Sequence, residues 1–524
     1  MRQRLVIGAT ALTAVALGVT YLALPLMGSD LSAQVARTGF FAEHGPTPVD
    51  LRWYGGVHQF GYSLVSQPVM TLLGVRVTGV VAMVASAIVF ALLLLRTGVP
   101  RPLLGSLVGV VTIAGNLASG RVTYGLGVMF GITALLALTM RRRTPSLAGA
   151  AVAAGLASAT SPVAGLFVGL VGAALVLTRR PAAGLALGVP AAVPMVVTAL
   201  LFSDGGWMNI SRTDTVHAMV TCLLVAALVA YRPVRVGALL AAAGVLVAAL
   251  VHTPVGLNAV RLPVMFGLPL LAAAARLPGP LRVRLPRPVR GRPVGVAALC
   301  VLLGVTCWWQ PPVVTADLRS MGEPTSDRSY FAPLLNELRQ RELTGRVEIP
   351  PTQNYWEAAY LEDTPLARGW LRQADIARNP LFFTTVPGAP GTGVELTADS
   401  YRSWLDENAV QYVAVPDAEL SWVGRAEARL VTGGLAYLNL VWTSPHWRLY
   451  AVEDARPLVE QPAVVVEHTP TAITVRLPSA QTVLVRVRHS RWLTTEPQAR
   501  LSESEGWTLL TTTDPGTYTI SSTR

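Results

Sequence analysis

Carboxylates are rare in the first 311 residues of this 524-residue sequence, and three of the five that occur there share one segment. Asp30, Glu43 and Asp50 all lie between residues 28 and 76. A carboxylate can act as a general base that deprotonates a hydroxyl group attacking the anomeric carbon of a sugar. Asp30 also precedes a periodic apolar segment that begins at Leu31, where an aspartate can cap a helix. Both roles stay open for Asp30.

Arginines in other short connections could hold a phosphate group. Arg121 lies in the short turn Asn116–Gly125, and Arg261 begins a later apolar segment. A planar guanidinium suits a phosphate or diphosphate. An arginine at a membrane boundary can equally keep its charge in water while its stem covers apolar surface. The candidate substrate-binding or phosphate-binding residues are Arg52, Tyr54, His58, Arg121, Tyr124, His252, Asn258 and Arg261.

The candidate residues lie between long apolar segments, which must therefore position them. Of the whole sequence, 52 % is hydrophobic and only 14 % is charged. Crossing the hydrocarbon of a bilayer takes about twenty apolar residues. The first segment lacks a convincing cleavage site and is expected to be an uncleaved anchor. The sequence predicts about eleven transmembrane helices, near residues 5–27, 77–95, 102–118, 122–140, 146–160, 163–178, 182–202, 216–231, 236–252, 262–276 and 294–310.

Positive and negative charges separate along this predicted topology. With the N-terminus in the cytoplasm, 17 of the 23 arginines before residue 311 fall in cytoplasmic connections, the last of them Arg276–Arg292. All five carboxylates fall outside, as the positive-inside rule favours. We expect a multi-pass plasma-membrane protein with a cytoplasmic N-terminus and an extracytoplasmic C-terminal domain. The net charge of +12 does not indicate nucleic-acid binding, because the arginines stand between apolar segments.

The chain is expected to divide into three parts. Residues 1–311 form the transmembrane domain, with a first external loop at 28–76. Residues 312–460 alternate short β-type and helical stretches and predict an external α/β domain. Residues 461–524 change to β patterning, with a turn at Asp514-Pro515-Gly516, and predict an external β-sandwich.

The first external loop is long and unusual in composition. Its apolar positions from Leu31 to Phe41 predict a helix along the membrane surface, with Arg37 and Glu43 on the wet side. Gly45-Pro46 should end that helix, and the turn Trp53–Gly56 (WYGG) follows it.

These features together resemble the GT-C superfamily of polytopic membrane glycosyltransferases. Asp30, the following helix and the WYGG turn are similar to the first loop of such enzymes. Ser119–Gly127 (SGRVTYGLG) and Ser161–Phe167 (SPVAGLF) look like luminal turns of bacterial members. Two stretches of the soluble part resemble regions of actinobacterial cell-envelope proteins of this type, and they are Arg368–Phe383 (RGWLRQADIARNPLFF) and Tyr401–Asp417 (YRSWLDENAVQYVAVPD).

The resemblance implies transfer of a sugar, hexosyl or pentosyl, from a polyprenyl-phosphate donor to a glycan or lipid-linked acceptor outside the membrane, usually with inversion. Asp30 would be the catalytic base and Asp50 a secondary or acceptor-binding carboxylate. Ser29 and Leu31 flank Asp30, so the paired acids of metal-dependent members are missing. We predict no cofactor and no metal ligand, and a divalent metal has no support in the sequence.

Two other classes stay open. A transporter or flippase of a lipid-linked precursor usually carries ionisable residues near the middle of the membrane, and no predicted span contains a carboxylate. A non-catalytic envelope scaffold would use the β-sandwich to bind a protein or glycan partner and would not need Asp30.

Overall fold

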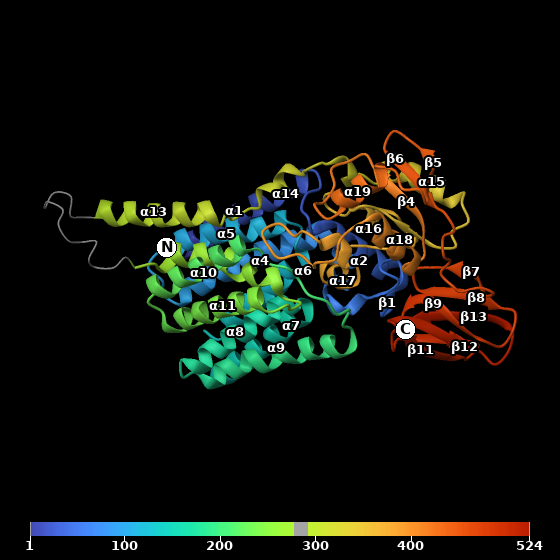
Figure 1. The fold of residues 1–524 in the computed structure, drawn as a ribbon. Helices are drawn as coiled ribbons and strands as arrows, with labels where there is room; N and C mark the ends of the chain where they lie inside the picture. Colours follow the sequence, from blue (N-terminus) through green and yellow to red (C-terminus); the bar gives the residue numbers. More distant parts are fainter. Residues whose placement is uncertain (1, 277–291, 523–524) are drawn as a thin grey trace.

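The computed structural model describes residues 2–276 and 292–522, and in this part eleven long helices form a bundle with the C-terminal part at one end (Figure 1). Each predicted apolar segment coincides with one helix. The bundle helices are α1 (Arg2–Ala23), α4 (Val75–Arg96), α5 (Pro102–Ala118), α6 (Val122–Ala137), α7 (Arg143–Thr160), α8 (Pro162–Leu177), α9 (Pro181–Leu201), α10 (Arg212–Leu228), α11 (Arg232–Leu250), α12 (Arg261–Ala274) and α13 (Arg292–Trp309).

The outside of the bundle is apolar. Leu12, Leu200 and Leu250 leave 73 %, 69 % and 75 % of their surface exposed, which suits contact with lipid. Within the described residues, five helices are long and apolar enough to cross a membrane, and α5, α6, α8 and residues 295–309 of α13 are shorter apolar helices. The protein is embedded in a membrane, and the number of eleven crossings remains a prediction.

Successive bundle helices run in opposite directions, so their connections alternate between two ends. At the end next to the C-terminal part, Trp492 Nε1 donates to the carbonyl of Leu201 at 2.8 Å. At the other end, Arg101 donates to the carbonyls of Ala272 and Ala275, the last turn of α12, where a cation stabilises a helix terminus. The predicted connection Arg276–Arg292 lies outside the described residues except at its ends.

The first loop folds into short elements at the end next to the C-terminal part. They are α2 (Leu31–His44), β1 (Val49–Asp50), β2 (Val57–His58), η1 (Gln59–Gly61) and α3 (Ser66–Leu73). The expectation of a helix ended by Gly45 is confirmed, because the Gly45 N–H donates to the carbonyl of Phe41 at φ +64°. The prediction that Arg37 lies on the solvent-facing side of this helix is wrong. Its side chain is buried against the rings of Trp53 and Tyr62, since the first loop folds back over this helix.

A four-stranded sheet follows the bundle in the order β3-β4-β6-β5, with β3 and β4 parallel and the other pairs antiparallel. Helices surround this sheet. The elements are α14 (Thr315–Arg319), η5 (Pro324–Ser326), η6 (Arg328–Tyr330), α15 (Ala332–Arg339), β3 (Arg346–Glu348), α16 (Glu357–Tyr360), α17 (Arg372–Arg378), η7 (Pro380–Phe383), α18 (Ala398–Glu407), β4 (Val410–Pro416), α19 (Gly424–Thr432), β5 (Leu438–Thr443) and β6 (Trp447–Val452).

Two antiparallel sheets form the last part, in the orders β10-β13-β8-β7 and β11-β12-β9. Their strands are β7 (Val464–His468), β8 (Ala472–Leu477), β9 (Thr482–Arg488), β10 (Leu493–Glu496), β11 (Arg500–Ser504), β12 (Trp507–Thr511) and β13 (Gly516–Ser522). The predicted fold class, a helical membrane part followed by a C-terminal part with β-sheets, is confirmed.

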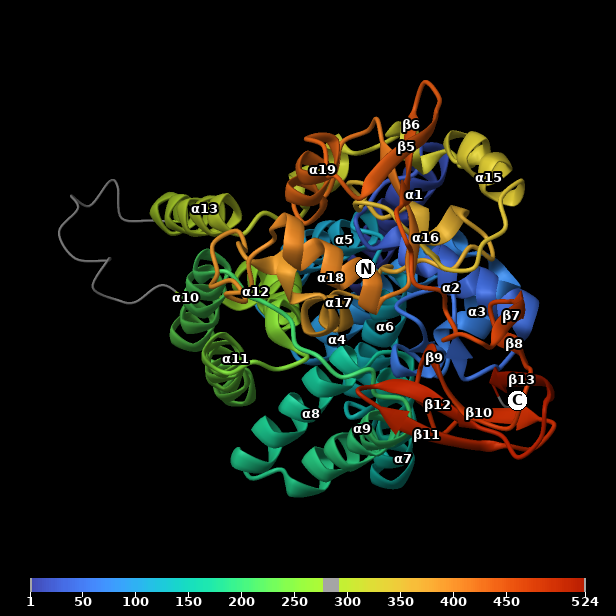
Figure 2. The ribbon, with the colours of Figure 1, turned by 45° about the vertical axis from the view of Figure 1, so that its right-hand side comes forward.

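The first loop belongs to the cores of both C-terminal parts, which lie side by side with it at this end of the bundle (Figure 2). Trp53 and Tyr54 pack in the cluster that contains Trp356 and Trp447. On the other side, Val49 and Leu51 pack among the strands of the two antiparallel sheets. The WYGG turn continues these contacts, since the Gly55 carbonyl accepts from the N–H of Arg488 at 2.8 Å. The loop is thus fixed by residues hundreds of positions away.

Candidate active site

Asp30 meets two of the predicted arginines. Its Oδ2 accepts from Nε of Arg121 and from a terminal nitrogen of Arg261, both at 3.3 Å. The carboxylate is buried, and it stands at the N-cap position of α2 without making a side-chain capping bond. Two guanidinium groups on one oxygen stabilise a charged carboxylate. The alternative that Asp30 serves to cap α2 has no support in this geometry.

Two glycines allow the turns that carry Asp30 and Arg121 to touch. Gly28 has φ +104° and Gly120 has φ +74°, which other residues rarely adopt. A Cβ on Gly28 would lie 2.5 Å from the carbonyl oxygen of Ala118, and one on Gly120 would lie 2.4 Å from the backbone nitrogen of Leu31. The two turns therefore interlock backbone against backbone.

An apolar cavity of about 690 Å³ runs beside this cluster between α4, α6, α8, α10, α11 and α12. Tyr124 lines the cavity and links it to the charges, because the guanidinium of Arg261 lies 5.2 Å from the centre of its ring. The Tyr124 hydroxyl is buried and has no hydrogen-bond partner in the described part of the chain. Asp30, Arg121 and Arg261 themselves are not among the described residues that line the cavity. The cavity is large enough for part of an apolar ligand.

Asp50 and Arg52 form an ion pair of their own. Arg52 Nε donates to Asp50 Oδ1 at 3.0 Å, and a terminal nitrogen donates to Oδ2 at 2.7 Å. The same terminal group donates to the carbonyl of Ala36, and the guanidinium lies over the ring of Phe40. Burial opposes the charge of Arg52, but Asp50 raises the pKa of that guanidinium. This pair fastens β1 to α2 and makes no contact with Asp30 among the described residues.

Tyr54 and His58 connect the loop to the C-terminal part. The Tyr54 hydroxyl donates to the carbonyl of Gly369 at 2.5 Å. The backbone N–H of His58 donates to Asp204, and its Nε2 lies 3.0 Å from Oγ of Ser490. Neither side chain contacts Asp30 in the part of the chain that is described.

His252 and Asn258 lie near another connection. The His252 ring stacks on Trp207 with 4.0 Å between centroids. Asn258 is buried and its amide donates to Sδ of Met208 at 3.2 Å. Of the predicted site residues, the structure thus brings together Asp30, Arg121, Tyr124 and Arg261 and places the other six in contacts elsewhere.

Two residues of the C-terminal part contact the Asp30 turn and were not predicted. Asp317 Oδ1 accepts from the N–H of Ser29, and Trp370 Nε1 donates to the Ser29 carbonyl, both at 3.0 Å. Asp317 closely follows the last apolar segment, which is the one feature of the sequence that could have marked it.

A second group of charges lies inside the sheet part. Arg368 contacts three carboxylates, Asp375 at 3.0 Å, Glu427 at 3.0 Å and Glu348 at 3.5 Å. All four side chains are buried, and the Tyr401 hydroxyl donates to Glu427. One cation cannot neutralise three anions, so burial and the neighbouring carboxylate raise the pKa of Glu348 well above its usual range. Burial therefore favours the neutral form of Glu348. We interpret this group as a structural element, since its four side chains are buried and bind one another.

Stability should depend on pH through a buried glutamate nearby. Burial raises the pKa of Glu357 to about 7, although its Oε2 accepts from Thr352 Oγ1. Between pH 4.5 and 7 the unfolded chain loses this proton first, so the folded state is progressively destabilised as the pH rises. We expect Glu357→Gln to match wild type in melting temperature near pH 4.5 and to exceed it increasingly up to pH 7. Tryptophan fluorescence during heating measures this.

Glu395 is exposed and supplies the control for that comparison. Its glutamine variant should follow wild type at every pH. A constant difference between Glu357→Gln and wild type from pH 4.5 to 8 would show that folding does not raise the pKa of Glu357.

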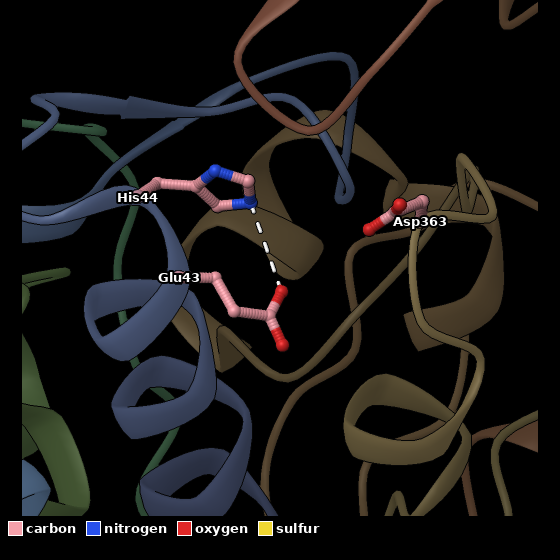
Figure 3. A group of neighbouring side chains, drawn as sticks. All are labelled: Glu43, His44 and Asp363. Carbon is pink, nitrogen blue, oxygen red and sulfur yellow. Dashed lines mark ion pairs between the residues drawn. The ribbon is translucent and has the colours of Figure 1, made fainter.

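One group of possible metal ligands lies on the surface of the first loop. One ligand atom each from Glu43, His44 and Asp363 falls within 4.8 Å of the others (Figure 3). Nε2 of His44 lies 3.9 Å from Glu43, whose side chain is 69 % exposed. Solvated acids often approach one another in this way, and we assign no metal to the group.

No protein-family model and no curated protein matches this chain. Among solved structures, the arabinofuranosyltransferase AftD from Mycobacteria matches over 91 % of this chain and 41 % of its own, with 18 % identity and a TM-score of 0.45. ArnT from Cupriavidus metallidurans matches without ligand over 84 % of this chain and 96 % of its own, with 13 % identity and a TM-score of 0.45. ArnT bound to undecaprenyl phosphate matches over 85 % of this chain and 97 % of its own, with 13 % identity and a TM-score of 0.44.

This chain thus spans less than half the length of the mycobacterial enzyme. That neighbour is a sugar transferase by name, in line with the class that the sequence resembles. TM-scores below 0.5 do not fix a shared fold or substrate, so the activity is inferred below from the side chains of this chain.

Proposed function

We propose that this protein is a GT-C-type membrane glycosyltransferase that moves a sugar from a polyprenyl-phosphate donor to a hydroxyl group of an envelope acceptor. One observation carries the proposal. Asp30 is paired with Arg121 and Arg261 directly beside an apolar cavity inside the helical bundle. A carboxylate, two phosphate-binding cations and room for a lipid tail are the parts that such a reaction needs.

The proposed donor would lie with its isoprenoid tail in the cavity and its phosphate on the two arginines. The phosphate would replace Asp30 as their partner, and the unpaired hydroxyl of Tyr124 would donate to a phosphate oxygen. Asp30, released from the arginines, would then accept the proton of the acceptor hydroxyl. The acceptor oxygen would form a bond to the anomeric carbon as the bond from that carbon to the phosphate oxygen breaks, with inversion. Arg121 and Arg261 would stabilise the negative charge on the departing polyprenyl phosphate.

We also propose that the reaction takes place on the extracytoplasmic face. The charges support this orientation, because Asp30 lies at the end of the bundle that meets the C-terminal part, whereas Arg101 and Arg180 lie at the opposite end. Arginines collect on the cytoplasmic side of membrane proteins. Acceptor selection would belong to the C-terminal part, which covers the Asp30 turn.

Donor affinity tests the role of the arginines. We expect Arg261→Gln to weaken binding of radiolabelled polyprenyl phosphate about 10–100-fold in nanodiscs, because one charge-assisted hydrogen bond is worth about 1.5–3 kcal/mol. Arg235→Gln is the control, since Arg235 donates to a backbone carbonyl, that of Ala226, rather than to Asp30, and lies at the opposite end of the bundle.

The control variant should bind the lipid as wild type does. If Arg261→Gln and wild type bound the lipid with equal affinity, the phosphate would not bind at this site. Lipid movement across proteoliposomes without any transferred sugar would favour a flippase over a transferase.

A further inference from the structure

The C-terminal part binds both backbone polar groups of Ser29, the residue that precedes Asp30. The N–H of Ser29 donates to Asp317 Oδ1, and the Ser29 carbonyl accepts from Trp370 Nε1, each at 3.0 Å. Asp317 belongs to α14, directly after the last bundle helix, and Trp370 precedes α17. Both hydrogen-bonding groups of one backbone unit are therefore used by residues about 290 and 340 positions away.

Asp317 also holds the turn that carries Arg121. Its second oxygen, Oδ2, accepts from Oγ of Ser119 at 2.5 Å. The Ser119 carbonyl in turn accepts from the N–H of Asp30 at 3.1 Å. The Asp317 carboxylate is buried and uses one oxygen for each turn, so a single side chain sets the position of Asp30 relative to Arg121.

We propose that Asp317 and Trp370 are positioning residues that hold Asp30 in place to act as the base. The inference rests on the proposed function and assigns part of the work to the C-terminal part. A base must lie within hydrogen-bond reach of the proton it removes, and a displacement of about 1 Å can cost about 10²-fold in rate. One turn later, Ser32 Oγ donates to the carbonyl of Asn354 at 2.6 Å, so the same part also holds the first turn of α2.

The variants Asp317→Ala and Trp370→Phe test this role. Each removes hydrogen bonds to Ser29 and should lower kcat about 10–100-fold. Asp317→Asn should keep most of the activity, because its carbonyl can accept from Ser29 and its amide can donate to Ser119. Trp370→Phe should leave KM for the donor unchanged, since in the described part of the chain the indole N–H binds Ser29 and not the turn that carries Arg121.

A double-mutant cycle with Asp30→Asn separates positioning from general stability. Once the base is absent its position no longer matters, so adding Asp317→Ala to Asp30→Asn should change the residual rate less than about 3-fold. A role in stability alone would lower the rate by the same factor in both backgrounds, and that result would overturn the inference.

Matched controls come from the same part of the protein. Trp404 Nε1 donates to Asn379 at 2.8 Å, and Asp327 accepts from the N–H of Ser329 at 2.9 Å, both far in sequence from Asp30. Trp404→Phe and Asp327→Ala should keep transfer within about 2-fold of wild type at equal amounts of folded protein. A loss in these variants equal to that in Trp370→Phe and Asp317→Ala would also overturn the inference.

Hydrogen exchange tests the contacts without any reaction. Asp317→Ala should speed exchange of the Ser29 amide in the peptide around residues 28–34, and Trp404→Phe should not. Unchanged exchange in Asp317→Ala would refute the inference while leaving an active wild type as a transferase. If wild type transfers no sugar, the proposed function and the catalytic role of these contacts are both wrong. Faster exchange in Asp317→Ala would then show only that Asp317 stabilises the local structure.

Discussion

Replacing Asp30 by asparagine is expected to lower the rate of sugar transfer about 10²–10⁴-fold, the range that a general base contributes. The amide cannot accept a proton from the acceptor hydroxyl. Arg121 and Arg261 would lose their anionic partner and be free to bind phosphate. Donor affinity should therefore stay equal or increase while kcat falls, which steady-state kinetics and lipid binding measure separately.

Asp214 provides the control for this substitution. It lies at the start of α10 at the same end of the bundle and hydrogen-bonds with Ser211. Asp214→Asn should transfer sugar within about 2-fold of wild type. If Asp30→Asn kept the wild-type rate, Asp30 would not be the base, whatever the donor affinity.

The largest expected effect on stability comes from Arg368. Substituting methionine would leave Asp375, Glu348 and Glu427 buried without their cation. Breaking a buried ion pair from one side costs about 3–5 kcal/mol. We expect a clearly lower melting temperature for the full chain, with a larger loss at pH 8 than at pH 5, because protonation relieves the repulsion among the carboxylates.

Glu348→Gln is the matched variant for the same group. Burial raises the pKa of Glu348 and favours its neutral form, so an amide should be tolerated with little change in melting temperature. If both variants melted like wild type, the group would not stabilise the sheet. A large loss in Glu348→Gln alone would mean that Glu348 is ionised there.

Hydrophobicity and charge were enough to predict the bundle helices, and β patterning predicted most strands. Five strands were not predicted, β1, β2, β5, β10 and β11, and each is at the edge of its sheet. Edge strands are covered on fewer sides, so their sequences can be short and polar, as in Arg500–Ser504 (RLSES). The burial of Arg37 was also missed, because it depends on the rings of Trp53 and Tyr62, which the folded loop places against its guanidinium.

The candidate site was predicted in part for a topological reason. Asp30, Arg121 and Arg261 follow an odd number of crossings and must lie at the same end, and their separations of 91 and 231 residues do not prevent contact. Sequence could not tell which arginine pairs with which carboxylate. Arg52 was taken for a phosphate ligand, yet it forms its closest ion pair with Asp50, two residues away.

The first loop is synthesised early, whereas several of its partners are synthesised last. The N–H of Val49 donates to Oγ of Ser522, and that of Leu51 donates to the carbonyl of Pro470. Ribosomes add about 5–20 residues per second, so β1 leaves the ribosome roughly 20–100 s before Ser522 is made. During that interval the loop around Asp30 lacks the partners that shape it. The nascent chain can thus enter the membrane before β1 has its partners, and the last strands complete the fold of the first loop.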